Sequence, residues 1–331
     1  MRSRFLKGAL AVVAIVAAAG LFPVAALAAT FDYSLSGGFF FDPNLPQDTL
    51  PNPTQGNGTL GGLELSGPVT NPTGLPAGST APANTYRDIG WGCAANGTNC
   101  AAAGTNVVAE SPFDGANAAA RSALRVDTVR GAGDAIQLTS PVAGGTEWTG
   151  PLTGITANFD ATPTSGDITS DGTWVFISNI FHDNSAIDDD SINLVDAIIR
   201  TNLFLSSGFS QLDSDVQINF EETFNAAPCA NDVGPDCADR FTFTTDTFAP
   251  VTFESGGITY LLQFDLFTND PNIVIIGNTV WTGEGDINDL WVIMRLTEVA
   301  VPLPGSLLLL GAGFLGTAVV GVVRRRRAVR K

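Results

Sequence analysis

An uncharged apolar run near the C-terminus decides which part of this chain can fold in water. Residues 307–323 are 17 residues without a charge, about 25 Å long as a helix and enough to span a thin bilayer. Arginines follow directly, at Arg324, Arg325, Arg326 and Arg327, and positive charge stays on the cytoplasmic side of a membrane. We therefore predict a transmembrane helix over 307–323, with the preceding chain outside the cytoplasm.

The N-terminus has the layout of a secretory signal peptide. Basic residues precede an apolar stretch, and Ala26, Leu27 and Ala28 form a small-residue cleavage site in front of Ala29. We predict a signal peptide over 1–28 that is removed after Ala28, and an uncleaved anchor is the alternative. The exported body then spans residues 29–300 as one domain.

The predicted body is strongly acidic. It holds seven arginines and no lysine against 33 acidic residues, so its surface repels nucleic acid phosphates and anionic membranes. We expect no nucleic-acid partner. The lack of lysine in the body also excludes lysine nucleophiles there, and the single histidine, His182, excludes a cluster of histidine metal ligands.

Short runs of alternating apolar and polar residues, separated by turn residues, dominate the body. Strand candidates are Gln217–Phe220, Arg240–Thr244, Ile258–Leu266, Asn272–Ile276 and Leu290–Leu296. This pattern predicts an all-β fold, an antiparallel β-sandwich or jelly-roll-like body.

One segment fits either a helix or a strand. Residues 192–205 could form a helix capped by the preceding aspartates, or a strand with Ala197, Ile199 and Leu203 on one face. The β-branched residues and the strand-rich context favour the strand.

Four cysteines fall into two local pairs. Cys93 and Cys100 are separated by six residues, and Cys229 and Cys237 by seven. We predict two local disulfides, Cys93–Cys100 and Cys229–Cys237. Zinc binding is the alternative, but neither spacing is the CxxC of zinc sites, and an exported protein meets oxidising conditions.

We expect a protein without cofactors, and the acidic clusters in the sequence make calcium binding the alternative. Asp188, Asp189 and Asp190 are the main candidates for calcium ligands, and acidic residues also crowd near 213–215 and 284–289. None of these clusters matches the DxDxDG calcium loop. Turn capping and surface charge explain the clusters equally well.

The last 31 residues resemble the PEP-CTERM sorting tail of Gram-negative bacteria that produce exopolysaccharide. The motif Val301, Pro302, Leu303, Pro304 is followed by the apolar run and the arginines, and it resembles the VPLP variant of that tail over residues 301–331. The resemblance implies that an exosortase, a membrane-embedded cysteine enzyme, removes the tail during export. An ordinary membrane anchor that is never processed is the alternative.

A second resemblance, to the THxN family of PEP-CTERM proteins, covers residues 86–296. It rests on two segments, Phe181-His182-Asp183-Asn184 before an expected strand and Glu222-Thr223-Phe224-Asn225, and on the later Cys237-Ala238-Asp239-Arg240-Phe241. Phe181 stands where the family has threonine. The resemblance implies no catalytic activity, and we expect His182, Asn184, Glu222, Thr223 and Asn225 to hold the fold, with a ligand or catalytic role as the alternative.

These observations predict an exported cell-surface or matrix protein without catalytic residues. Its expected partners are the secretion machinery, the exosortase, the inner membrane during transit, and exopolysaccharide in a structural or adhesive role. One alternative is a calcium-assisted carbohydrate-binding module with an aromatic platform drawn from five tryptophans, at positions 91, 148, 174, 281 and 291. Another is a secreted hydrolase with two carboxylates about 5 to 10 Å apart in a cleft.

Overall fold

The computed structural model describes residues 28–56, 58, 61–70, 79–92, 105–108, 121–128, 166–185, 187, 190–223, 237–244, 248–268 and 270–299. The predicted signal peptide before Ala28 and the sorting tail lie outside these residues, as do Cys93, Cys100 and Cys229. Both predicted disulfides therefore stay predictions. Within the described ranges, no helix is long and apolar enough to cross a membrane.

Strands make up all the regular structure of the described chain, which confirms the all-β prediction. They are β1 (Thr30–Phe40), β2 (Thr54–Gln55), β3 (Leu63–Pro68), β4 (Thr85–Trp91), β5 (Thr105–Val107), β6 (Ser122–Thr128), β7 (Gly166–Thr169), β8 (Asp171–Asn184), β9 (Leu194–Leu205), β10 (Ser210–Glu221), β11 (Asp239–Phe243), β12 (Val251–Ser255), β13 (Ile258–Phe267), β14 (Ile273–Ile276), β15 (Thr279–Thr282) and β16 (Asp286–Glu298). Each of the five strand candidates overlaps one of these strands, and two of them, Arg240–Thr244 and Asn272–Ile276, extend one residue beyond β11 and β14.

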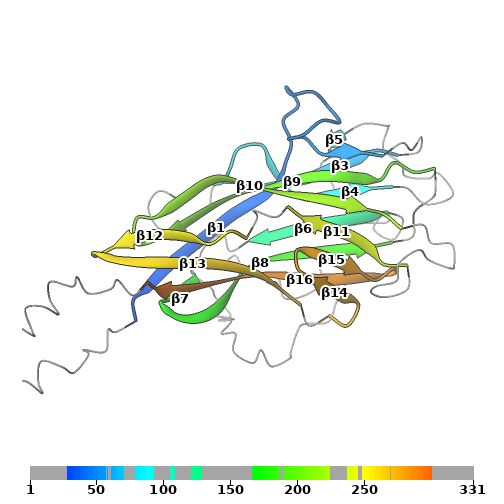
Figure 1. The fold of residues 1–331 in the computed structure, drawn as a ribbon. Helices are drawn as coiled ribbons and strands as arrows, with labels where there is room; N and C mark the ends of the chain where they lie inside the picture. Colours follow the sequence, from blue (N-terminus) through cyan, green and yellow to red (C-terminus); the bar gives the residue numbers. More distant parts are fainter. Residues whose placement is uncertain are drawn as a thin grey trace, which may run out of the picture.

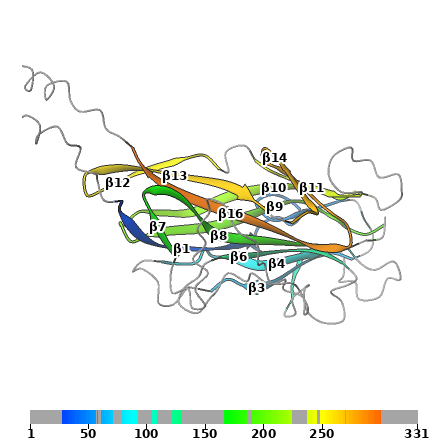
Figure 2. The same cartoon turned by 90° about the horizontal axis from the view of Figure 1, so that it is seen from below.

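All sixteen strands belong to one sheet, where a sandwich would have two separate ones. The main order is β12-β13-β16-β8-β6-β4-β1-β9-β10-β11-β15-β14, and neighbours pair antiparallel except for the parallel side pair β3–β5. The sheet curls into a half-barrel (Figures 1 and 2), so that β14 at one edge contacts β16 near the other.

Aromatic contacts across the curl join strands that are not neighbours in the sheet. The rings of Phe31 on β1 and Tyr260 on β13 lie 5.2 Å apart, and those of Trp91 on β4 and Phe220 on β10 lie 4.8 Å apart. Neither pair joins neighbouring strands. The core therefore forms inside the curl, in one cluster around Trp91 and a second around Tyr260.

The segment that fits either a helix or a strand, residues 192–205, contains a strand, as we predicted from its β-branched residues. It forms β9, which pairs with β1 and β10 in the middle of the sheet. Ala197, Ile199 and Leu203 are buried, because a central strand presents alternate side chains to the core.

Candidate functional site

The residues of the THxN-like motif lie far apart in the sequence and meet at one place in the structure. His182 and Asn184 belong to the end of β8, Glu222 and Thr223 follow the end of β10, and Asp239 begins β11. Since β8 and β11 are distant in the order of the sheet, the curl brings them together. We call these five residues the motif cluster; Asn225 lies outside the described residues.

The histidine motif lies at the end of one strand and in front of another. The strand that the resemblance expects after the motif is β9, while His182 itself lies inside β8 and pairs with Leu124 on β6 and Asn288 on β16. The apolar residues Ile180 and Phe181 extend β8 up to it, so the polar motif closes this strand.

The imidazole of His182 is enclosed by aromatic rings. Its residue is 1% exposed, its ring stacks on Trp91 at 5.7 Å, and the edges of Phe220 and Phe241 complete the enclosure. Burial lowers the pKa of His182 to about 3, because removal from water disfavours the charged form. The ring is therefore neutral near pH 7, with Nδ1 2.7 Å from Thr282 Oγ1.

Two acidic side chains share the interior with this histidine. Burial, and then the charges of Glu222 and Glu284, raise the pKa of Asp239 well above its ordinary value. Burial likewise raises the pKa of Glu222 to about 8, although the indole of Trp91 donates to its Oε2 at 2.9 Å. The two carboxyls disfavour each other's ionisation, because the charge of Glu222 is, after burial, the second cause of the raised pKa of Asp239.

The remaining contacts of the motif cluster go to backbone groups. The amide of Thr223 donates to Asp239 Oδ1 at 2.8 Å, and its hydroxyl donates to the carbonyl of Cys237 at 2.8 Å. On the other side, Asn184 Nδ2 donates to the carbonyl of Thr282 at 3.0 Å. These bonds fasten β8, the segment after β10, β11 and β15 to one another.

The geometry gives this cluster little access for a substrate. His182, Asn184 and Asp239 are each at most 1% exposed. His182 Nε2 lies 3.9 Å from Asp239 Oδ2, too far for a hydrogen bond. The Glu222–Asp239 pair is thus a pair of carboxyls enclosed by the core, unlike the two carboxylates in an open cleft that glycoside hydrolysis needs.

The described acidic candidates for calcium ligands do not meet at one site. Asp190 is exposed in a turn, while Asp188 and Asp189 lie outside the described residues. Asp215 holds the guanidinium of Arg200 through two hydrogen bonds of 2.6 and 2.7 Å. Within the described ranges, no group of three histidine, cysteine or acidic side chains is placed to hold a metal ion.

The tryptophans divide between the core and the surface. Trp91 and Trp291 are buried at 0% and 2% exposure, so neither can face a glycan. Trp174 lies under the guanidinium of Arg295, Trp281 is half-buried on β15, and Trp148 lies outside the described residues.

Sequence reasoning missed the partners that complete the motif cluster. Trp91 and Thr282 lie at long sequence distances from His182 and belong to no motif. The one available signal was the position of Trp91 at the end of a strand-like run in front of Cys93. Protein-family models and the sequences of curated proteins give no match to this chain.

Proposed function

We propose that this chain is an exported bacterial protein of the cell surface or extracellular matrix, sorted by an exosortase, with a structural or adhesive role toward exopolysaccharide. The observation that carries the proposal is the meeting of the two ends of the body. The amide of Ala29 donates to Ser170 Oγ at 2.9 Å, and Ser170 Oγ donates to Glu298 Oε1 at 3.1 Å. A single serine thus joins the predicted first mature residue to the last strand before the sorting motif.

This arrangement suits a body that is held at a membrane and then released from it. The start of β1 and the end of β16 lie at the same end of the sheet (Figure 1). The predicted signal peptide and the predicted tail would therefore leave the body side by side, with the rest of the sheet pointing away from the bilayer. Processing at both ends would leave the hydrogen bonds through Ser170 in place.

The chemistry of the body supports a role in a matrix. Its acidic surface keeps the protein soluble and away from anionic lipids. The motif cluster is enclosed and ties strands together, so we assign it to stability of the sheet. The proposed disulfides, Cys93–Cys100 and Cys229–Cys237, would add loop staples suited to an oxidising exterior.

Fractionation of the host tests the matrix role. We expect the protein to sediment with the polysaccharide matrix of wild-type cells and to appear in the medium of a strain that makes no exopolysaccharide. A chain that ends at Ala300, without the tail, is the matched control and should stay in the cell envelope in both strains, because it lacks the sorting signal. An unchanged distribution of the full chain between the two strains would contradict the matrix role.

A further inference from the structure

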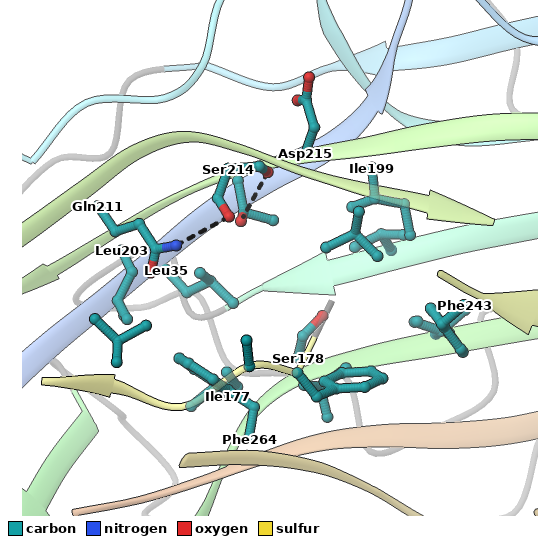
Figure 3. Close-up of a pocket in the computed structure, with 18 of the residues that line it drawn as sticks. Leu35, Ile177, Ser178, Ile199, Leu203, Gln211, Ser214, Asp215, Phe243 and Phe264 are labelled. Carbon is teal, nitrogen blue, oxygen red and sulfur yellow. Dashed lines mark hydrogen bonds between the residues drawn. The ribbon is translucent and has the colours of Figure 1, made fainter. Parts of the chain in front are cut away.

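The core inside the curled sheet is interrupted by a cavity of about 210 Å³. It lies where the two core clusters meet: Ile199 and Phe243 line it from the first cluster, and Leu35, Ile177 and Leu203 from the second. Figure 3 shows these side chains surrounding one space between the opposed walls of the sheet. Protein interiors are close-packed, with few voids larger than a water molecule, so an open space of this size needs an explanation.

The lining is apolar inside, apart from the hydroxyl of Ser178, and polar at the rim. Aliphatic and phenyl groups form the rest of the interior, and the hydroxyl of Ser178 donates to the carbonyl of Asp127 at 2.9 Å. A water molecule needs two to four polar partners to stay in a cavity, and Ser178 alone does not supply them. An apolar cavity of ~150 Å³ takes up a molecule as large as benzene. The space fits an apolar group better than water.

A β-bulge in β10 builds the polar rim. Gln211 pairs with Leu203, but the next pair is Ser214 with Thr201, so β10 holds one more residue than β9 in this stretch. Across the opening, Ala249 and Pro250, in front of β12, are exposed members of the lining. The cavity therefore reaches the surface between the bulge and this segment.

The rim offers hydrogen bonds without a free positive charge. Gln211 Nε2 donates to Ser214 Oγ at 3.2 Å, and both side chains line the cavity. Asp215 points away from the cavity (Figure 3) and holds Arg200, while exposed Asp213 adds a further negative charge beside it. A carboxylate at this rim would meet negative charge, but a hydroxyl could bond to Gln211 and Ser214.

We propose that this cavity binds one short aliphatic chain with a neutral hydroxyl head, the chain lying between the walls of the sheet and the head on Gln211 and Ser214. The volume sets the length: at about 30 Å³ for a unit the size of a water molecule, the space holds about seven methylene-sized units. The proposal does not depend on export or on sorting.

Calorimetric titration of the protein purified from its host with 1-octanol tests the proposal. We expect saturable binding at one site per chain and a rise in unfolding temperature with the octanol concentration. Octanoate at pH 7 should bind at least tenfold more weakly, and Asp213→Asn should reduce that difference. The absence of saturable octanol binding would overturn the site, and equal binding of octanoate would overturn the neutral head group.

Filling the cavity separates a specific site from binding elsewhere on the protein. Val216→Phe from β10 and Val251→Phe from β12 each place a ring into the lining; two variants are used so that misfolding of one leaves the other. We expect at least tenfold weaker octanol binding with the far-UV circular dichroism spectrum retained. Ile276→Phe, at an exposed position on β14 outside the lining, is the matched control. Undiminished binding in a folded, filled variant would contradict the proposal.

Discussion

At the scale of single residues, the motif cluster places a neutral histidine and two protonatable carboxyls inside a β-sheet core. Each polar group costs free energy when it leaves water, and the cost is offset only by good partners. Trp91, Thr223 and Thr282 each supply one such partner, to Glu222, Asp239 and His182 respectively. The second polar atoms of these side chains have no hydrogen-bond partner among the described residues. We therefore expect the cluster to govern how stability depends on pH.

The free energy of unfolding should fall as the pH rises from 7 to 8 and level off above that. The pKa of Glu222 is about 8 in the fold against 4.5 for the ordinary group, so its proton stabilises the folded state, and that contribution is lost progressively as the pH rises from about 4.5 to 8. His182 has a lowered pKa, and it destabilises the fold only below its ordinary value of 6.5. Between pH 7 and 8 the histidine no longer titrates, and loss of the carboxyl proton gives a slope of about 1 kcal/mol per pH unit.

Chemical denaturation of Glu222→Gln across this pH range measures the effect. The amide oxygen still accepts from Trp91, but it cannot lose a proton, so the slope should become shallower. Glu221→Gln, at the exposed neighbouring position, serves as the control and should keep the wild-type slope. A wild-type stability that is flat between pH 7 and 9 would show that the pair is not protonated in the fold.

At the scale of elements, the strands could be predicted and their arrangement could not. The alternation of apolar and polar residues in Ile258–Leu266 predicts β13, because a half-buried strand shows every second side chain to the core. The β-branched residues of β9 favour a strand for a segment whose sequence also fits a helix. The curl depends on contacts such as Phe31 with Tyr260, whose members are distant in sequence. For the same reason, His182 and Glu222 could be named from a motif, but their partners Trp91 and Thr282 could not.

A buried ion pair between β4 and β6 should be important for this part of the sheet. Arg125 Nε donates to Asp88 Oδ1 at 2.6 Å, and both residues are at most 3% exposed. Asp88→Ala removes the carboxylate that accepts from Arg125 inside the core, so we expect a loss of about 3 to 5 kcal/mol in the free energy of unfolding.

The double variant Asp88→Leu with Arg125→Met tests whether the loss comes from the buried charge of Arg125. Two apolar groups of similar volume remove both charges at once, so the double variant should recover most of the stability in urea denaturation. A double variant as unstable as Asp88→Ala alone would place the effect in packing and not in charge.

At the scale of the whole molecule, the two ends of the body form one unit. Cleavage after Ala28 would turn the amide of Ala29 into an α-ammonium group, with Ser170 between it and the carboxylate of Glu298. An ammonium near a carboxylate is stabilised, so the mature N-terminus should tie β1 to β16 more firmly than the uncleaved chain does.

Glu298→Gln in the mature protein tests this link. We expect a loss of up to about 1 kcal/mol, since the pair is only partly buried, and the loss should shrink above pH 8 as the α-amino group loses its charge. Thermal unfolding at pH 6.5 and pH 9 gives both values. Equal losses at the two pH values would indicate that the N-terminus carries no charge there, as in an uncleaved chain.

The central claim is that this body is exported and then freed from a sorting tail. Its most direct test is the intact mass of the protein from its own host, compared with the same strain lacking the exosortase. We predict a mass that lacks residues 1–28 in both strains and lacks the segment after the motif Val301-Pro302-Leu303-Pro304 only where the enzyme is present. A mass that retains residues 307–331 in both strains would make the tail an ordinary anchor and contradict the sorting claim.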